Sequence, residues 1–440
     1  MKIRSTLKWN PGFPARRRGR RALPAAVICA LLLLGGAGAV SAAGSGEEEA
    51  PFAERYQEMS WEEIVAEAQG QELFFYMWGG SDSINQYVQG YLGARLREEY
   101  GIDLEMVPVS DASVFVNKVL GEKQAGRDSD GSVDVMWING ENFRSMKEAD
   151  LLFGPYASRL PNMEYVNAED PSIANDFGFP VEGYESPYGS AQFVMIYDSA
   201  RVPDPPRSVG ALLEWIRANP GRFAYTAPPD FAGSAFVRHL FYYAAGGAQG
   251  LLGPFDRERY DQVAAEAWEL MNELEPYLWR EGNTYPETPA QRQDLFANGQ
   301  IFFDFDYNPS QAANLIAQGR YPETTRTFVF EEGAVPGTIG NTHYLAISYN
   351  SPHKAAAMVL ANLVLSPEAQ FEKTRPEVWG DLPVVSMDRL PEEWQERFRN
   401  QDRHPALLSP RVLGEHTLPE LQATWLQAIE EGWTRNVLED

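Results

Sequence analysis

Cysteine and histidine are scarce in this sequence of 440 residues. The one cysteine, Cys29, lies in an apolar segment near the start, so the rest of the chain can form neither a disulfide nor a thiol nucleophile. A Gly-x-Ser-x-Gly nucleophile elbow is also absent. The five histidines show no metal-ligand spacing; they are His239, His343, His353, His404 and His416. These absences disfavour covalent hydrolases and histidine-based metal centres.

Basic residues are also few, and eight of them lie in residues 1–43, which contain no acid. Without that segment the chain has 29 basic against 62 acidic residues and a formal net charge of −33. Phosphate binding needs a basic surface, so we expect no nucleic-acid partner. Only five lysines remain, and an acid-rich, lysine-poor surface favours a high-salt medium that screens the repulsion.

Residues 1–43 have the organisation of a secretory signal peptide. A basic run at residues 16–21 precedes an apolar segment at residues 25–40, and small residues around Ala42 suit cleavage. Glycines interrupt the apolar segment, which is short for a membrane span, and Ile28 before Cys29 does not suit lipidation. We therefore expect export to the periplasm, removal of residues 1–42 or 1–43, and an unlipidated monomer. The sequence leaves the export route open.

The order of the expected elements indicates an α/β protein. Strands over residues 71–78, 102–109 and 132–138 alternate with helices over residues 84–100 and 113–125. This order predicts a mostly parallel sheet with helices on both faces. About 397 residues exceed what one core usually serves, so we expect two lobes. Their expected segments are residues 55–190 with 302–368 for the first lobe, and residues 191–301 with 369–440 for the second.

The stretch at residues 132–142 joins a buried strand to a polar turn. Asn139, Glu141 and Asn142 follow the apolar strand and precede a segment of helical composition. In open α/β sheets, ligands bind at the carboxyl ends of strands. An ordinary turn whose side chains cap a helix is the alternative.

Two Gly/Pro-interrupted apolar strands predict crossings between the lobes. They span residues 183–198 and 298–309, and we expect hinges at residues 187–193 and 303–308.

Four sequence motifs carry a resemblance to a known family; they are Trp137-Ile-Asn-Gly-Glu-Asn142, Leu152-Phe-Gly-Pro155, Pro187-Tyr-Gly-Ser-Ala-Gln192 and Leu278-Trp-Arg280. The chain resembles the family-1 extracellular solute-binding proteins of ABC importers, and within them a YnjB-like branch related to thiamine and iron binders. The resemblance covers nearly all of the chain after residue 43. It implies a type II periplasmic-binding-protein fold, in which two α/β lobes joined by crossover strands close on a ligand. This chain has Tyr188 where the branch often has tryptophan.

A receptor of this kind would bind a small solute and present it to an ABC permease in the inner membrane, without a cofactor or metal. We expect its ligand-binding residues at strand ends and crossings; they are Trp78, Ser81, Asp82, Asn85, Trp137, Asn139, Glu141, Asn142, Tyr188, Gln192, Phe231, Gly233, Ser234, Tyr307, Asn308, Asn341 and Thr342. Aromatic faces and carboxylates, with no accompanying lysine or arginine apart from Arg280, favour a small organic cation or a polar aromatic heterocycle. The resemblance to the related branch implies a thiamine-like compound as the leading example. An anion would instead need arginines or an uncovered helix amino terminus, which residues 231–234 could supply.

Two other functions compete with the receptor. A secreted hydrolase could use Glu141 with Glu185, or Asp304 with Asp306, as a carboxylate pair. A ferric-ion binding protein could use the paired tyrosines Tyr242 and Tyr243, although these lie in a run of helical composition that favours packing.

Overall fold

The first sheet is built from the strands predicted in the first third of the chain. The structure, a computed structural model, describes residues 52–401 and 403–439, so the expected signal peptide and Cys29 lie outside the described residues. β1 (Glu72–Trp78) pairs in parallel with β2 (Asp103–Val109) and β3 (Val135–Ile138). The intervening helices are α3 (Asp82–Gln86), the π-helix η1 (Tyr87–Leu92), α4 (Gly93–Tyr100) and α5 (Ser113–Gln124). The predicted βαβαβ order is confirmed.

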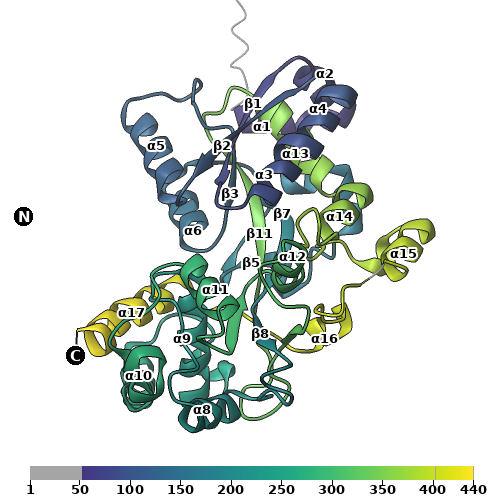
Figure 1. Cartoon of the computed structure of the whole chain (residues 1–440). Helices are drawn as coiled ribbons and strands as arrows, with labels where there is room; N and C mark the ends of the chain where they lie inside the picture. The colour runs from purple at the N-terminus through teal and green to yellow at the C-terminus, as the bar shows by residue number, and fades with distance from the viewer. Residues whose placement is uncertain (1–51, 402, 440) are drawn as a thin grey trace, which may run out of the picture. The chain divides into compact units, whose positions relative to one another are not determined.

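β1 lies between β2 and β3, and its apolar residues are buried on both faces. Leu73, Phe75 and Met77 are fully buried, and the alternate Tyr76 is almost so. A near-continuous apolar run of this kind is typical of a parallel strand covered on both sides. In Figure 1, α5 and α6 (Glu141–Glu148) lie on one side of the sheet. The other side carries α2 (Trp61–Ala68), α4, α13 (Lys354–Val364) and α14 (Pro367–Thr374).

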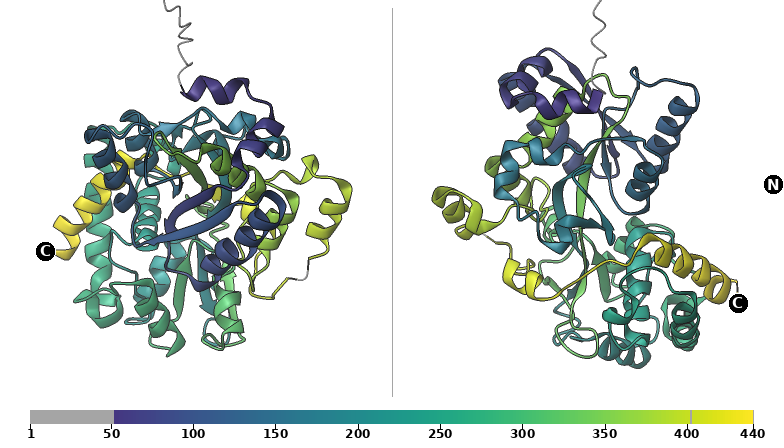
Figure 2. Two further views of the ribbon diagram at one scale, coloured as in Figure 1. Left: turned by 90° about the horizontal axis from the view of Figure 1, so that it is seen from above. Right: turned by 180° about the vertical axis from the view of Figure 1, so that it is seen from behind.

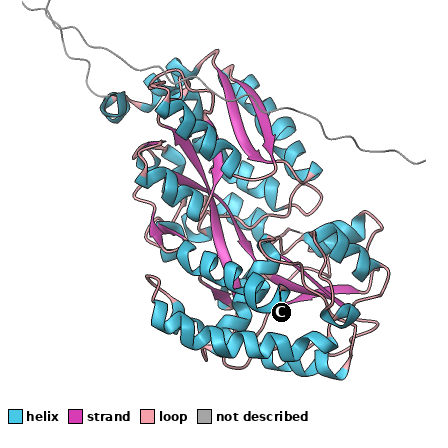
Figure 3. Cartoon of the chain, turned by 90° about the vertical axis from the view of Figure 1, so that its left-hand side faces the viewer, coloured by secondary structure: helices cyan, strands magenta, loops and turns pink. Residues whose placement is uncertain are grey.

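β11 (Thr338–Ser348) extends from the first sheet toward the second sheet (Figures 1 and 3). It pairs antiparallel with β3, with β4 (Leu152–Phe153) and with β7 (Glu185–Gln192), and in parallel with β12 (Thr417–Leu418). The first sheet is therefore mixed, and the expectation of a mostly parallel sheet is wrong, because β11 enters it antiparallel to β3. Only Phe193 separates β7 from β8, and its backbone N–H donates to Ile339 O at 2.8 Å. β7 with β8, and β11, therefore connect the two sheets.

The second sheet is antiparallel, in the order β10 (Thr325–Phe328), β8 (Val194–Asp198), β9 (Phe303–Asp306). Its aromatic core includes Phe193, Phe236 and Phe305. Helices surround this sheet; they are α8 (Val209–Ala218), α9 (Phe231–Ala244), α10 (Arg257–Leu274), α11 (Pro289–Ala297) and α12 (Gln311–Ala317).

The second crossing expected over residues 298–309 is wrong. β9 lies inside the second sheet beside β8, because Phe303 and Phe305 pack into the core that covers that sheet. The chain returns to the first sheet through β11, about 30 residues later. β9 and β10 pair with β8 in the second sheet, whereas residues 302–368 were expected to belong to the first lobe.

The C-terminal third contributes to both cores. Trp379, Trp394 and Phe398, from α15 (Glu392–Arg399) and the loop before it, pack in the core of the first sheet. α17 (Ala423–Trp433) packs in the core of the second sheet, beside α9 and α10 (Figure 2). α16 (Pro410–Glu415) lies between them in sequence. No helix in the described ranges combines the length and apolar composition that a membrane crossing requires.

Candidate functional site

The carboxyl end of β1 presents an exposed tryptophan over a glycine turn. Trp78 is 47% exposed, and a Cβ on Gly80 would collide with its ring. Ser81 caps α3 by accepting from Ile84 N, and Asn85 Nδ2 donates to Gly79 O at 3.0 Å. Ser81 and Asn85 thus hold the turn in place, whereas the indole of Trp78 and the exposed Asp82 face outward.

The turn between β3 and α6 is held by a buried carboxylate. Gly140 takes a positive φ of 63°, and its N–H donates to Asp176 Oδ2 at 2.5 Å. The side chains of Asn139 and Asn142 are half-buried, and Glu141 is exposed. Glu141 Oε2 accepts from Gln427 Nε2 at 2.9 Å, so this turn contacts α17.

Tyr188 lies in an aromatic cluster with Trp137, His343 and Trp379. Its ring centroid is 5.7, 5.5 and 5.3 Å from theirs, and His343 stacks on Trp379. Tyr188 is fully buried and its hydroxyl has no hydrogen-bond partner. Tyr188 and Trp137 are thus brought together, but they are joined by two residues that the sequence analysis did not select.

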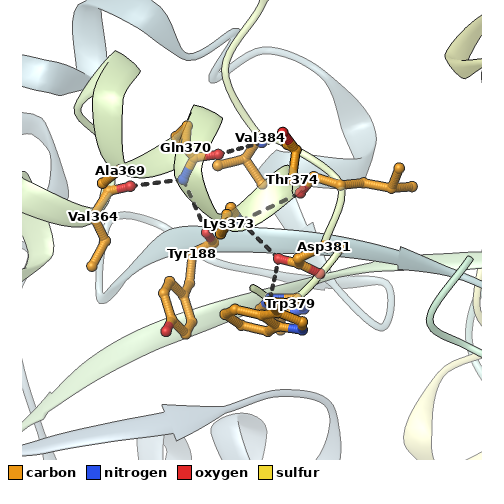
Figure 4. Close-up of polar contacts among 12 residues, drawn as sticks. Tyr188, Val364, Ala369, Gln370, Lys373, Thr374, Trp379, Asp381 and Val384 are labelled. Atoms are coloured by element: carbon orange, nitrogen blue, oxygen red, sulfur yellow. Dashed lines mark hydrogen bonds and ion pairs between the residues drawn. The ribbon is translucent and has the colours of Figure 1, made fainter. Parts of the chain in front are cut away.

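A buried ion pair supports this cluster (Figure 4). Lys373 Nζ donates to Tyr188 O at 2.6 Å and to Asp381 Oδ2 at 2.7 Å, and His343 Nε2 lies 3.1 Å from the same oxygen. Burial lowers the pKa of Lys373 against the opposing effect of Asp381. Burial raises the pKa of Asp381, but His343 and Lys373 outweigh it and hold that pKa below its ordinary value. Lys373 and His343 thus favour the ionised form of the buried Asp381.

A second polar network forms around Glu420. One oxygen, Oε1, accepts from Tyr307 OH at 2.5 Å, from Arg238 Nη2 at 3.1 Å and from Asn341 Nδ2 at 3.2 Å. Arg238 Nη1 also donates to Ser234 Oγ at 2.8 Å. The network joins three expected site residues, from α9, from the loop after β9 and from β11.

Aromatic side chains border the Glu420 network. Phe231, at the start of α9, is 44% exposed and its ring lies 4.6 Å from that of Tyr307. Phe177, from the loop that contacts Gly140, lies 6.5 Å from Phe231. These contacts link α9 with the turn between β5 (Asn175–Asp176) and β6 (Phe179–Pro180), which form a separate two-stranded sheet.

Several residues expected to bind the ligand instead contact other parts of the protein. Gln192 Nε2 donates to Leu413 O and His416 O, and Asn308 Nδ2 donates to Trp379 O. A Cβ on Gly233 would overlap Thr226 O, and Thr342 is buried in β11.

The amino terminus of α9 is not free for an anion. Asp230 caps it by accepting from Gly233 N at 2.9 Å. The expectation that residues 231–234 leave this helix end uncovered is therefore wrong, because a carboxylate already occupies it.

Five residues of these networks were not among those predicted from the sequence; they are Arg238, His343, Lys373, Asp381 and Glu420. Arg238 could have been selected from the sequence, because it is an arginine inside the largely apolar helix Phe231–Ala244. Glu420 could not, because it lies 113 residues from Tyr307 in a polar segment.

Two of the residues proposed for the competing functions, Asp304 and Tyr242, have structural partners. Asp304 forms a fully buried ion pair with Arg292 and accepts from Tyr321 OH at 2.5 Å. Tyr242 is buried in α9, and its hydroxyl donates to Pro419 O at 2.8 Å. Within the described residues, no three His, Cys, Asp or Glu side chains are grouped to hold a metal ion.

Two sheets connected by β7–β8 and β11, with aromatic and polar side chains gathered at the connection, define a solute-binding protein of the periplasmic type. The chain belongs to the bacterial extracellular solute-binding proteins, whose family pattern matches residues 92–399. It is 39% identical over 373 residues to Protein YnjB of Escherichia coli (strain K12), which covers 85% of this chain and 92% of that protein.

Two solved structures show the same fold. The spermidine/putrescine ABC transporter substrate-binding protein PotD from Streptococcus pneumoniae strain Canada MDR_19A has a TM-score of 0.60 at 15% identity, over 84% of this chain and 99% of that chain. A periplasmic thiamin binding protein has a TM-score of 0.55 at 16% identity, over 83% of this chain and 96% of that chain. The fold is thus the type II periplasmic-binding-protein fold, with two α/β lobes joined by crossover strands, as the resemblance implied.

Proposed function

We propose that this protein is a periplasmic receptor that closes on a small organic cation and delivers it to the inner-membrane permease of an ABC importer. Solute-binding proteins of ABC importers bind small solutes and partner with a permease, which supports the general role. The export signal, the monomeric state and binding without catalysis belong to the same proposal.

The charge balance of the site is the observation that supports a cation as the ligand. Arg238 and Lys373 are each already paired with a carboxylate, at 3.1 and 2.7 Å. Asp230 closes the helix end that an anion would use. The exposed Trp78, Asp82 and Glu141 offer an aromatic face and negative charge, which suit a cation.

A thiamine-like compound is the leading example. The similar solved structures include a protein named for thiamin and one named for spermidine and putrescine. All three compounds are cations. Thiamine combines a positive charge with an aromatic ring that could stack on Trp78.

We also propose lobe segments that follow the packing of the two cores. The first lobe would comprise residues 55–190 with 341–399, and the second would comprise residues 194–337 with 406–439. The residues between these segments would then be the hinges.

The test is a calorimetric titration of the purified protein with thiamine, its phosphates, a polyamine and simple anions. We expect binding of a cation that Trp78→Ala and Glu141→Gln each weaken several-fold, whereas Glu98→Gln, at an exposed site on α4, leaves it unchanged. Tight binding of an anion, or cation binding that neither substitution affects, would refute the charge argument. Failure of every solute to bind would count against the receptor itself.

A further inference from the structure

A cavity of about 580 Å³ lies beside the crossover strands, on the side away from the contact between α6 and α17. We call it the rear cavity. In Figure 1, α6 and α17 lie to the left of β11, whereas α15 and α16, which both line the rear cavity, lie to its right; the view from behind in Figure 2 agrees. Of the residues expected to bind the solute, only Gln192 lines it. Its volume is typical of small-molecule pockets, which span about 300–1,000 Å³.

The walls of the rear cavity come from both lobes and from the crossover strands. Ser190 and Gln192 belong to β7, and Thr417 belongs to β12, which pairs with β11. Phe398 packs in the core of the first sheet, and Leu413 packs in a core that includes residues of β8. A molecule in the rear cavity would therefore contact both lobes, and its fit would depend on the angle between them.

Much of the wall is apolar and accessible. Leu382, Leu407 and Leu408 line the rear cavity with half-buried side chains. Met387, which also lines it, is 38% exposed and is one of few large apolar side chains exposed to that extent in the described part of the chain. Removing such surface from water favours binding, so a ligand of this cavity should have an apolar body.

The charged side chains at the rear cavity reverse the overall charge of the protein. The chain has 37 basic and 62 acidic residues, yet the described lining includes Arg399, Arg403 and Arg411 and only one acid, Asp381. Asp381 already lies in the buried ion pair of Figure 4, and Arg411 pairs with Glu415 at 2.7 Å. Within residues 52–401 and 403–439, Arg399 and Arg403 form no ion pair with a carboxylate. These two arginines favour an anionic group on the ligand.

We propose that the rear cavity is a second ligand site, which binds a small amphipathic anion and thereby favours the closed form of the protein. Arg399 and Arg403 bind the anionic group, because guanidinium groups form strong charge-assisted hydrogen bonds with anions. The leucines around Leu408 cover the apolar body. This site is separate from the site for the transported solute, and only its effect on closing rests on the proposed receptor function.

The position of the crossover strands gives the direction of that effect. They lie between the rear cavity and the contact between the lobes, so closing on one side should widen the other side. Gln427 Nε2 donates to Glu141 Oε2 at 2.9 Å, as a closed form requires, and the rear cavity is present in the same structure. A ligand shifts an equilibrium toward the form that it binds better. The anion and the solute should therefore each strengthen binding of the other.

The first experiment uses two fluorescent probes with the same aromatic body. One is 8-anilinonaphthalene-1-sulfonate, an anion, and the other is N-phenyl-1-naphthylamine, which is uncharged. We expect one saturable site for the sulfonate, with at least about 5-fold weaker binding of the amine. Arg399→Gln with Arg403→Gln should weaken the sulfonate to a similar extent and leave the amine unchanged. Arg397→Gln, on α15 but outside the lining, is the matched control.

The second experiment tests the effect on closing without any solute. Saturating sulfonate should lower the radius of gyration of the natural protein and of Arg397→Gln in small-angle scattering, and should not change that of the double arginine variant. Leu408→Trp fills the rear cavity and should abolish binding of both probes. Thermal melting and the near-ultraviolet spectrum of each variant check that a loss of binding is not a loss of folding.

Several outcomes would overturn the inference. Absent or non-saturable binding of the sulfonate, equal affinity for the two probes, or binding that Leu408→Trp leaves unchanged would show that the rear cavity is not an anion site. Sulfonate binding that Trp78→Ala weakens and the double arginine variant does not would place the probe at the solute site instead. Arginine-dependent binding without compaction would refute the effect on closing. None of these results depends on which solute the receptor binds, so failure here is distinguishable from failure of the proposed function.

Discussion

At the scale of single residues, a substitution of Asp304 distinguishes a structural role of its carboxylate from a catalytic one. It is fully buried, and it holds Arg292, which also donates to Phe305 O at 2.5 Å. Removing one partner of a buried ion pair leaves an uncompensated charge and costs about 3–5 kcal/mol. We expect Asp304→Asn to lower the free energy of unfolding by that amount in urea denaturation. Asp294→Asn, which breaks an exposed pair with Arg320, should cost under about 1 kcal/mol.

This substitution also tests the hydrolase alternative. If Asp304→Asn left stability unchanged, the carboxylate would be free of a structural role, and a catalytic pair with Asp306 would regain support.

Glu185 should make stability depend on pH. Burial and Asp176 raise its pKa well above the ordinary value of 4.5, so the folded state binds the proton more tightly than the unfolded state. Stability from this group is therefore full below the unfolded pKa and is lost as pH rises through the folded pKa. We expect Glu185→Gln to melt higher than the natural protein at pH 8, by about 1–3 °C, and to lose that advantage near pH 4.5.

The measurement is a pair of melting curves at each pH, with Glu98→Gln beside them. A variant that melts lower at pH 8, or an advantage that does not change with pH, would contradict a buried, uncompensated carboxylate at this position.

Three of the residues expected at strand ends and crossings, Ser234, Tyr307 and Asn341, lie in one hydrogen-bonded network. Their role in ligand binding stays a prediction. The carboxylate at the centre of this network, Glu420, follows the two-residue strand β12, which has no periodic pattern. Its role depends on tertiary contacts that no local pattern encodes.

At the scale of elements, the hydrophobic pattern predicted where strands occur better than it predicted which strands pair with each other. β1, β2, β3, β8 and β9 all occur where apolar runs indicated them. β9 was assigned to a crossing because Gly and Pro flank it, yet its aromatic residues fill the second core. The sequence pattern over residues 342–349 predicts only the second half of β11, as a strand that returns to the first lobe. Pairing with β7 and β12 extends it back to Thr338, so the crossover is a strand in its own right.

At the scale of the whole protein, three contacts connect the turn between β5 and β6, and the start of α6, with α9 and with residues in and just before α17. Phe177 meets Phe231 at 6.5 Å, Gln422 Nε2 donates to Gly178 O at 3.2 Å, and Gln427 Nε2 donates to Glu141 at 2.9 Å. Each contact contributes little free energy. Together they can shift the equilibrium between the open and the closed form without determining it.

We expect the double substitution Phe231→Ala with Gln427→Ala to favour the open form. Small-angle scattering without solute should then give a larger radius of gyration than the natural protein has, because the contacts that hold the lobes together are lost. Saturating solute should compact both proteins, with the affinity of the variant reduced about 3- to 30-fold by the cost of closing. Gln318→Ala, after α12, is the control. Identical scattering of the variant and the natural protein, with and without solute, would show that these contacts do not govern closure.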